Sequence, residues 1–161
     1  MQVEVLHSQA GIATQILVTE DSTSLLVDSG DGTLRDLVKR KFNFETLKAI
    51  LLTHEHFDHV SGLYPLVNFL ILLGRRDRLS ISTPQPSTRI RVLLRPPVMY
   101  YEPAFPISIL ELRDGRKIRY GSLRAKCFEV SHAGTPCVGY SISGESGQRI
   151  VVSGDTRPCP S

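Results

Sequence analysis

The order of apolar and polar positions predicts strands in the first third of the chain. The chain opens with alternating apolar and polar residues, and short apolar runs follow at residues 16–18 and 25–27. The run at residues 49–52 is apolar throughout, which is typical of a strand buried on both faces. Between these last two runs, a turn with two glycines at residues 28–33 precedes a segment whose apolar side chains have helical spacing.

The rest of the chain mixes helices with strands. An apolar stripe over residues 60–70 predicts a helix that begins at about residue 58. A strand is predicted at residues 79–82, and the prolines of residues 84–106 leave room there for only a short helix. Four further strands are predicted at residues 107–112, 123–130, 138–142 and 149–152. Strands mixed with two or three helices favour a layered α/β or α+β fold.

The composition is that of a globular protein. With 41% hydrophobic and 22% charged residues, the 161 residues are enough for one domain, residues 1–161. The longest apolar stretch, residues 66–73, is far shorter than the ~20 residues that span a bilayer, so no membrane association is expected. Cys127, Cys137 and Cys159 form no Cys-x-x-Cys pair and, without a recognisable secretory signal, indicate reduced thiols in the cytoplasm.

Residues that bind metals gather directly after the buried strand at residues 49–52. His54 and His56 are two positions apart, so on an extended segment their side chains face the same way and can reach one ion. Asp58 and His59 follow where the chain turns into a helix and can point to a second ion. Imidazole and carboxylate are common ligands of zinc and suit manganese and iron as well. The spacing therefore predicts two neighbouring divalent metal ions, with zinc as the expected metal.

Two later segments repeat the arrangement of a strand followed by one residue of a ligand type. Residues 127–130 lead to His132, and residues 150–152 lead to Asp155. Ligands at the ends of adjacent strands converge on one edge of a sheet, where the sites of layered α/β folds tend to lie. Taken alone, either residue could be structural, but their agreement with the first cluster makes both candidate ligands.

The pattern His54-x-His56-x-Asp58-His59, followed by His132 and Asp155, resembles the metallo-β-lactamase superfamily. Residues 23–33, 59–63 and 153–157 look most like ribonuclease Z and related phosphodiesterases. The resemblance covers nearly the whole chain. It implies an αββα sandwich with two metal ions held at the edge between two sheets.

The resemblance also implies a role for each candidate ligand. One metal would be bound by His54, His56 and His132, the other by Asp58 and His59, with Asp155 bridging both. Two metals about 3.5–4 Å apart lower the pKa of a water between them, and the implied reaction is hydrolysis by a metal-bound hydroxide. Asp58 is the candidate catalytic residue, which would orient the nucleophile and accept its proton.

Two features depart from the family pattern. The superfamily usually supplies one more histidine late in the chain, and no histidine follows Asp155. We therefore expect a chain truncated at its C-terminus, with the second half of the sandwich incomplete, or a site completed by another chain. An uncovered sheet edge would favour self-association as a homodimer. Bacterial ribonuclease Z also commonly carries a long insertion between the positions of His132 and Asp155, where this sequence predicts only two plain strands.

Three functions stay open at the level of the sequence. The leading hypothesis is a metal-dependent phosphodiesterase or ribonuclease Z-like endoribonuclease, with RNA as a candidate substrate, although the missing insertion argues against tRNA 3′-end processing. A lactonase, thioesterase or sulfatase would use the same fold and the same metals on another ester. The missing histidine motivates a third hypothesis, a non-catalytic metal-binding or interaction module.

A run of arginines bears on the substrate. Arg75, Arg76, Arg78, Arg89, Arg91 and Arg95 follow one another closely in the sequence. Arginine grips phosphate well through its planar fork. The run is therefore either a phosphate-binding patch or a solvated face, and the net charge of +3 does not by itself imply a nucleic-acid partner.

Overall fold

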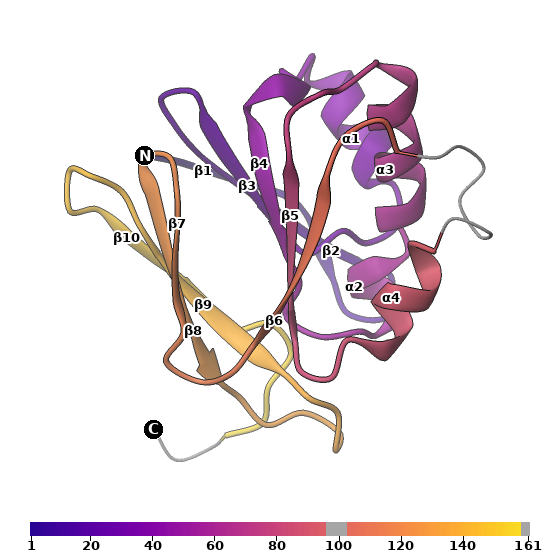
Figure 1. Ribbon diagram of the computed structural model, residues 1–161. Helices are drawn as coiled ribbons and strands as arrows, with labels where there is room; N and C mark the ends of the chain where they lie inside the picture. Colours follow the sequence, from indigo (N-terminus) through magenta and orange to yellow (C-terminus); the bar gives the residue numbers. More distant parts are fainter. Residues whose placement is uncertain (96–102, 159–161) are drawn as a thin grey trace.

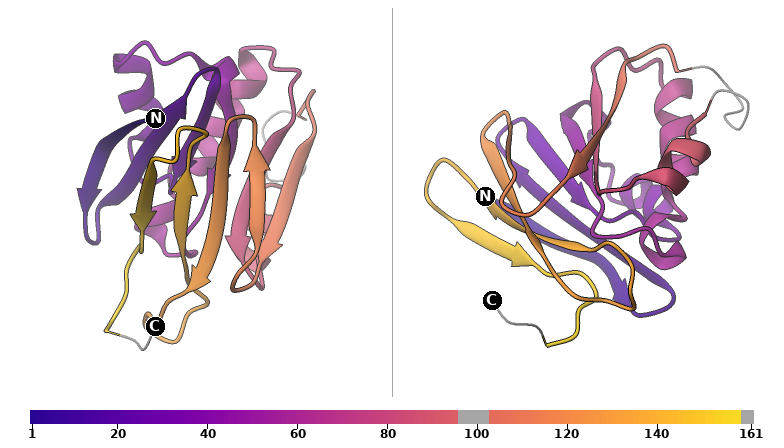
Figure 2. Two further views of the ribbon diagram at one scale, coloured as in Figure 1. Left: turned by 90° about the vertical axis from the view of Figure 1, so that its left-hand side faces the viewer. Right: turned by 60° about the horizontal axis from the view of Figure 1, so that its bottom comes forward.

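Two β-sheets packed face to face form the centre of the molecule, and helices cover the outer side of the larger sheet (Figure 1). The computed structural model describes residues 1–95 and 103–158. Figure 2 shows the strands of the two sheets lying over one another, with the chain passing from the larger sheet to the smaller one after β6. The expected layered α/β (α+β) arrangement is thereby confirmed.

The larger sheet has six strands in the order of the sequence. They are β1 (Gln2–Gln9), β2 (Ala13–Glu20), β3 (Thr23–Val27), β4 (Leu47–Leu51), β5 (Leu79–Pro84) and β6 (Ile107–Leu112). The first three pair antiparallel, and β3 to β6 pair parallel. Parallel neighbours need crossover connections. These carry α1 (Thr33–Lys39), η1 (Phe44–Thr46), α2 (Phe57–Val60), α3 (Leu63–Leu72) and α4 (Thr88–Leu93).

The smaller sheet has four antiparallel strands in the order β10-β9-β8-β7. They are β7 (Lys117–Tyr120), β8 (Leu123–Glu129), β9 (Val138–Ser143) and β10 (Arg149–Val152). Three of them match the predicted strands, whereas β7 is absent from the prediction. Two of the four side chains of β7 are charged, and they point to solvent.

The apolar runs fill two separate cores, one on each face of the larger sheet. Leu26, Ile50 and Ile81 pack toward the helices, whereas Leu25 and Leu51 pack toward the smaller sheet. The central strands are thus buried on both faces, as their continuous apolar runs predict. Among the described residues, no helix covers the outer face of the smaller sheet, so three of the four layers of the expected sandwich are present.

The predicted helix of residues 58–70 is two helices, α2 and α3, with a break at Ser61 and Gly62. Pro65 lacks the N–H that a continuous helix would donate to the Ser61 carbonyl, and proline is tolerated only in a first turn. The Gly62 N–H instead bonds the Ser29 carbonyl at 2.8 Å. A Cβ on Gly62 would lie 2.1 Å from the Gly30 carbonyl oxygen, so only glycine allows this close approach.

Two further expectations concern the membrane and the cysteines. None of the helices within the described ranges is long and apolar enough to cross a membrane. Cys127 and Cys137 are buried free thiols, as expected, and Cys159 lies outside the described residues.

Candidate metal centre

The six predicted ligands meet where strands of both sheets end. His54 follows β4, His132 follows β8 and Asp155 follows β10. His56 directly precedes α2, and Asp58 and His59 lie on it. Two hydrogen bonds join the larger sheet to the smaller one at this edge. The Val138 N–H bonds the Thr53 carbonyl at 2.9 Å, and the Tyr140 hydroxyl donates to the Leu52 carbonyl at 2.7 Å.

Three histidines form the first ligand group. The centroid of the His54 ring lies 4.5 Å from that of His56 and 5.0 Å from that of His132. His132 Nε2 lies 3.2 Å from His56 Nδ1. Each residue offers one nitrogen, and these atoms lie within 4.8 Å of one another. His54 is buried and the other two are half-buried, so the group opens to the surface through His56 and His132.

His54 also belongs to a second group, with His59 and Asp155, whose ligand atoms again lie within 4.8 Å of one another. The centroids of the His54 and His59 rings are 4.1 Å apart. The Asp155 carboxylate has Oδ1 3.6 Å from His59 Nε2 and Oδ2 3.9 Å from His132 Nε2. Asp155 therefore faces both groups.

Asp58 lies at the rim of the second group. Its Oδ2 lies 3.7 Å from His59 Nε2 and accepts a hydrogen bond of 2.9 Å from the Gly11 N–H in the β1–β2 turn. The second group therefore brings together His54, His59 and Asp155, where the sequence placed Asp58 beside His59. The Gly11 contact shows that the first hairpin takes part in positioning the site, which no pattern in the sequence indicates.

The buried Asp28 carboxylate and its partner Thr53 support the rings of His59 and His54. Asp28 Oδ2 lies 2.8 Å from His59 Nδ1, and Asp28 Oδ1 accepts the Thr53 N–H at 2.7 Å. The Thr53 hydroxyl donates to Asp28 and lies 3.1 Å from His54 Nδ1. Asp28 and Thr53 thus fix the rings of His54 and His59 through the nitrogens that face away from the centre. Such partners orient metal ligands and raise their basicity.

Burial keeps His54 in the form that binds a metal. Burial, and then the neighbouring His59, His56 and His132, lower the pKa of His54 to about 3. The imidazole is therefore neutral near pH 7, and neutral imidazole is the metal-binding form.

The pKa of His59 is raised, whereas that of His54 is lowered. Burial alone would lower the pKa of His59, but the hydrogen bond and charge of Asp28, followed by the charges of Asp58 and Asp155, raise it above its ordinary value. Burial raises the pKa of Asp28, although His59 and Thr53 oppose that rise. The negative charges around His59 thus favour its protonated form.

Two buried nitrogens without hydrogen-bond partners indicate whether a metal ion would fit these residues. Nε2 of His54 and Nε2 of His59 have no hydrogen-bond partner within the part of the chain that the structure describes. An unpaired buried polar atom costs about 1–3 kcal/mol. Both atoms point into the shared ligand groups, and imidazole and carboxylate are the donors that zinc prefers among nitrogen and oxygen ligands. The residues therefore fit a bound divalent cation.

The sequence missed Asp28 as a functional residue and grouped it only with a turn. Its position could have indicated a role, because Asp28 directly follows the fully buried strand β3, as several candidate ligands follow other strands. The Thr53 hydroxyl supports His54. Glu55 instead accepts the N–H groups of Arg89 and Ile90 at the start of α4.

The arginine run does not form one patch. Arg75 is buried and donates to the carbonyl oxygens of Phe44, Leu47 and Asp77, so it stabilises the packing of α3 on the sheet. Arg91 pairs with Glu111 at 3.2 Å. Of the six arginines of this run, only Arg89 lines one of the two cavities described next.

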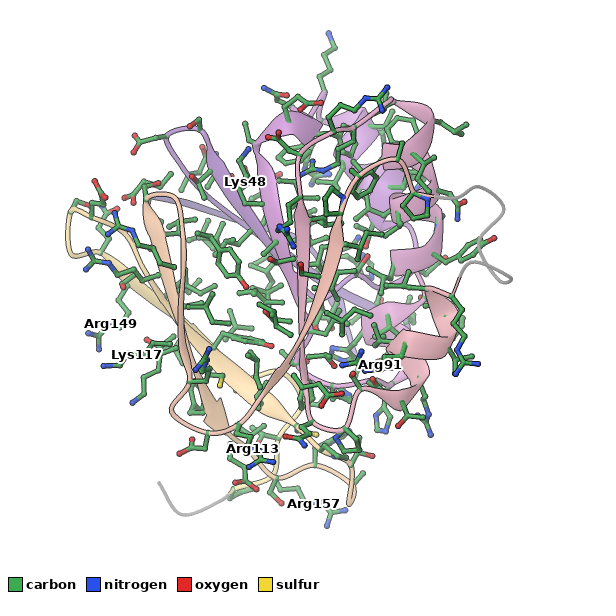
Figure 3. All side chains as sticks on the ribbon, in the orientation of Figure 1. Lys48, Arg91, Arg113, Lys117, Arg149 and Arg157 are labelled. Carbon is green, nitrogen blue, oxygen red and sulfur yellow. The ribbon has the colours of Figure 1, made fainter. Side chains whose placement is uncertain are left out.

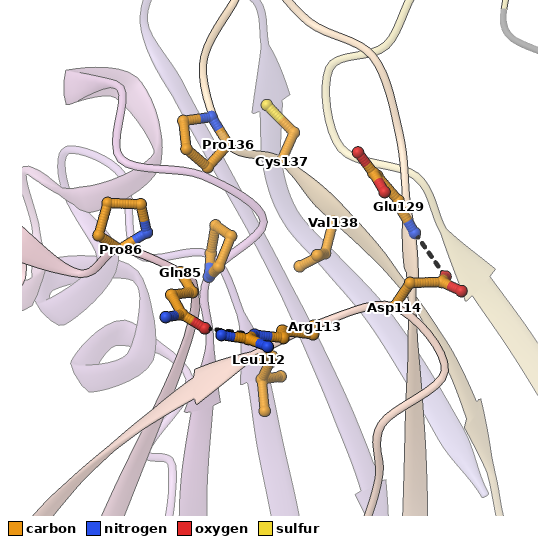
Figure 4. Close-up of a pocket in the computed structure, with 10 residues that line it drawn as sticks. Gln85, Pro86, Leu112, Arg113, Asp114, Glu129, Pro136, Cys137 and Val138 are labelled. Atoms are coloured by element: carbon orange, nitrogen blue, oxygen red, sulfur yellow. Dashed lines mark hydrogen bonds between the residues drawn. The ribbon is translucent and has the colours of Figure 1, made fainter.

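A groove leads away from the first ligand group. Pro84, Pro86 and Pro136 line both a cavity of about 280 Å³ beside Thr135 and a neighbouring one of about 550 Å³. Figure 4 shows the larger cavity, with Arg113 bonded to Gln85 on one wall and Pro136 on another. The Thr135 hydroxyl lies 3.4 Å from His56 Nε2, so the groove begins directly at the candidate metal centre.

Gly154 sets the position of Asp155, and replacing it by alanine tests this. Its φ is +63°, and an added Cβ would lie 2.7 Å from Cβ and Oγ1 of Thr53. We expect Gly154→Ala to lower the free energy of unfolding by more than the ~1–2 kcal/mol of left-handed strain and to weaken metal binding. Denaturant unfolding and zinc titration measure the two effects.

Gly147→Ala is the matched control for Gly154→Ala. Gly147 has a φ of +81°, and an added Cβ would meet no atom within 4 Å, so it carries the same kind of strain without the clash. Equal losses in the two variants, with metal binding unchanged in both, would contradict a positioning role for Gly154.

The comparisons with known proteins agree with this geometry. Residues 23–161 match the family described as Beta-lactamase superfamily domain. The chain is 31% identical to ribonuclease Z of Ignicoccus hospitalis, over 81% of this chain and 43% of the relative. It is 35% identical to ribonuclease Z of Methanopyrus kandleri, over 79% of this chain and 42% of the relative. The chain thus spans less than half the length of these two relatives.

Solved structures share the fold at lower identity. Human tRNase Z, short form, superimposes with a TM-score of 0.81 at 22% identity, covering 96% of this chain and 69% of that structure. The metallo-beta-lactamase fold protein YhfI from Bacillus subtilis gives a TM-score of 0.75 at 22% identity, covering 92% of this chain and 59% of that structure. The chain has the metallo-β-lactamase fold and belongs to the beta-lactamase superfamily.

Proposed function

We propose that this chain carries the metal centre of a metal-dependent hydrolase that cleaves phosphodiester bonds, with RNA as substrate. The observation that carries the proposal is the pair of ligand groups that share His54, with the Asp155 carboxylate facing both. Two shared groups suit a pair of divalent ions, and zinc is the expected metal. The similarity to proteins named ribonuclease Z supports the choice of RNA.

Each side chain of the centre has a part in this proposal. His54, His56 and His132 would hold one ion, and His59 the other, with Asp155 between them. Two divalent ions supply a water of lowered pKa and offset negative charge that develops on a substrate oxygen. Asp28 and Thr53 keep the rings of His59 and His54 oriented through their Nδ1 atoms.

Asp58 is proposed as the proton acceptor. Its Oδ2 is fixed by the Gly11 N–H, and among the described residues no donor bonds its Oδ1. A carboxylate held by one oxygen leaves the other free to orient a nucleophile and to take its proton. The side chain is partly exposed. The carboxylate therefore lies close to the surface from which a substrate would enter.

The groove walled by Pro84, Pro86 and Pro136 is the proposed place for the substrate next to the scissile bond. It begins at the His56 side of the centre, and its walls combine the three rigid prolines with polar and charged side chains. Arg89 and Arg113 border it, beside the carboxylates of Glu55, Asp114 and Glu129, and these two guanidinium groups are the cations that a phosphate would meet.

Hydrolysis of a panel of esters tests this function. We expect metal-loaded protein to cleave bis(p-nitrophenyl) phosphate and a short RNA, and to lose both activities when a chelator removes the metal. A lactone, a thioester and a sulfate ester should react far more slowly. Faster turnover of any of these three would reject the phosphodiesterase assignment, and no turnover of any ester would favour a non-catalytic metal-binding module.

Two expectations from the sequence remain predictions. The free thiols of Cys127 and Cys137 support a cytoplasmic location, because disulfides are rare there. A homodimer would be detected by analytical ultracentrifugation.

A further inference from the structure

An apolar hollow of about 540 Å³ lies between α2 and α4, beside the metal centre. Most of the residues that line it are apolar, and these are Phe57, Val60, Ile90, Val92 and Leu93. A hollow of roughly 300–1,000 Å³ with apolar walls is typical of a site for a small ligand. None of these five residues is a candidate metal ligand, so the hollow needs an explanation of its own.

The apolar hollow lies on the helix side of the larger sheet. Figure 1 shows α2 and α4 on that side, and residues of both helices line the hollow. In Figure 3, Arg91 of α4 lies on the helix side, whereas Lys117 and Arg149 project from the opposite side of the molecule. Both walls of the hollow therefore belong to the layer of helices on the larger sheet, and the smaller sheet takes no part in it.

Phe57 forms the outer wall of the apolar hollow. Among the described residues it has the highest exposed fraction of any large apolar side chain, at 76%. It stands between the candidate ligands His56 and Asp58 and is the first residue of α2. Single exposed apolar side chains are common, but one that lines an apolar hollow with a polar rim marks a site for a ligand.

The inner side of the apolar hollow is fixed by the core. Ile90 is buried in the core on the helix side, and Val60 and Leu93 pack against the same core. The Glu55 carboxylate accepts the N–H groups of Arg89 and Ile90 at 3.3 and 3.5 Å, which joins the start of α4 to the segment of the ligands. The hollow is thus preformed, because both helices are held in place from behind.

The apolar hollow is continuous with the groove proposed for the substrate. Three residues line both the hollow and the cavity beside Thr135, and these are Glu55, Thr88 and Arg89. The Thr135 hydroxyl lies 3.4 Å from His56 Nε2, so a path leads from the candidate metal centre through this cavity to the Phe57 ring. Arg89 stands at the border, where its guanidinium can meet a phosphate.

We propose that the apolar hollow binds one nucleobase of the RNA substrate, with the base stacked on the Phe57 ring. The choice of RNA rests on the proposed function. An aromatic ring accepts any base, because every base has a flat face, and a cation beside the ring suits the phosphate that adjoins the base. The hollow offers one exposed aromatic ring, so it holds the base of a single nucleotide beside the metal centre.

Replacing Phe57 by alanine tests the proposal. Two fluorescent phosphorothioate chains of equal length and charge serve as probes for the metal-loaded protein, one an RNA and the other a chain whose sugars carry no bases. Both resist cleavage, so binding is measured without hydrolysis. We expect the parent to bind the RNA more tightly. Phe57→Ala should lower the affinity for the RNA about 5- to 150-fold, the range for one base on one ring, and leave that for the base-free chain unchanged.

Two further variants separate stacking from apolar contact. Phe57→Trp keeps an aromatic ring and should retain the parental affinity for the RNA. Phe57→Leu keeps an apolar side chain without a ring and should lose most of the affinity that alanine loses.

Leu72→Ala is the matched control for Phe57→Ala. Leu72 is 65% exposed on α3 and does not line the apolar hollow, so its loss removes exposed apolar area elsewhere. Its affinity for both probes should equal that of the parent. Because the Phe57 ring is largely exposed, Phe57→Ala should itself keep the parental stability and metal content. Thermal unfolding and elemental analysis check both.

Three kinds of result would overturn the proposal. An equal loss of affinity for both probes in Phe57→Ala would show that the ring shapes the centre and holds no base. Equal affinity of the parent for both probes, or binding of neither, would exclude a base site. A parent that sediments as a dimer and a Phe57→Ala variant that sediments as a monomer would assign the hollow to a second copy of the chain.

The same measurements distinguish failure of this inference from failure of the proposed function. A protein that hydrolyses no phosphodiester but prefers the RNA probe through Phe57 would have the base site without the proposed chemistry. A protein that hydrolyses phosphodiesters but binds both probes equally would lack only the base site.

Discussion

Replacing His54 by alanine should lower the hydrolysis of bis(p-nitrophenyl) phosphate by more than about 100-fold. That is the upper end of the effect of a residue that merely supports a ligand. His54 is the imidazole that both ligand groups share, and it is buried between them. Its loss should therefore weaken both ions at once. Measured together, kcat/KM and metal content should fall in parallel.

His7→Ala is the matched control for His54→Ala. His7 lies on β1, and no ring contact or hydrogen bond joins it to the other four histidines in the described parts of the chain. We expect this variant to keep the parental metal content and rate. Parental rates in His54→Ala, with metal still bound, would show that the shared imidazole is not a ligand.

Replacing Asp28 by asparagine should weaken metal binding about 10- to 100-fold without changing the shape of the side chain. Asp28 is fully buried, and its carboxylate bonds both His59 and Thr53. An amide keeps one hydrogen bond to His59 but removes the negative charge that raises the pKa of that ring. Competition with a chromogenic zinc chelator measures the change in affinity.

Asp36→Asn distinguishes positioning from general stability. Asp36 is half-buried and accepts a hydrogen bond of 2.7 Å from the buried Gln15, so its replacement also removes an acidic partner of a buried side chain. Thermal unfolding of the metal-free proteins measures the stability lost in each variant. Equal metal affinity in Asp28→Asn and Asp36→Asn would contradict a positioning role for Asp28.

Much of the fold could be predicted because its central strands are buried on both faces. The continuous apolar runs of β3 and β4 are removed from water when both faces of each strand are covered, and this pattern is visible in the sequence. β7 was missed because Lys117 and Arg119 point to solvent and leave two inward side chains. Four residues with two charges carry too little apolar pattern to indicate a strand.

The apolar pattern alone does not indicate the division into two sheets, which was predicted only through the resemblance to the metallo-β-lactamase superfamily. Antiparallel and parallel pairing depend on register, and register depends on contacts between residues far apart in the sequence. The break between α2 and α3 follows from Pro65 and from the close approach of Gly62 to Gly30. The proline was visible in the sequence, but the close approach was not.

Several candidate ligands could be identified because they directly follow predicted strands, whereas the residues that support them could not. His54, His132 and Asp155 stand out as residue types that bind metals at strand ends. Asp28 also follows a strand, but the serine and glycines that come after it indicate only a turn. Its partner His59 lies thirty-one positions away, and only the folded chain brings the two together.

Metal content per chain, by elemental analysis of protein with a verified intact mass, tests the central claim most directly. The two groups that share His54 and face Asp155 predict about two divalent ions per chain. They also predict that Asp155→Ala removes most of this metal. A parent protein that binds no divalent ion when zinc, manganese or iron is supplied would contradict the account.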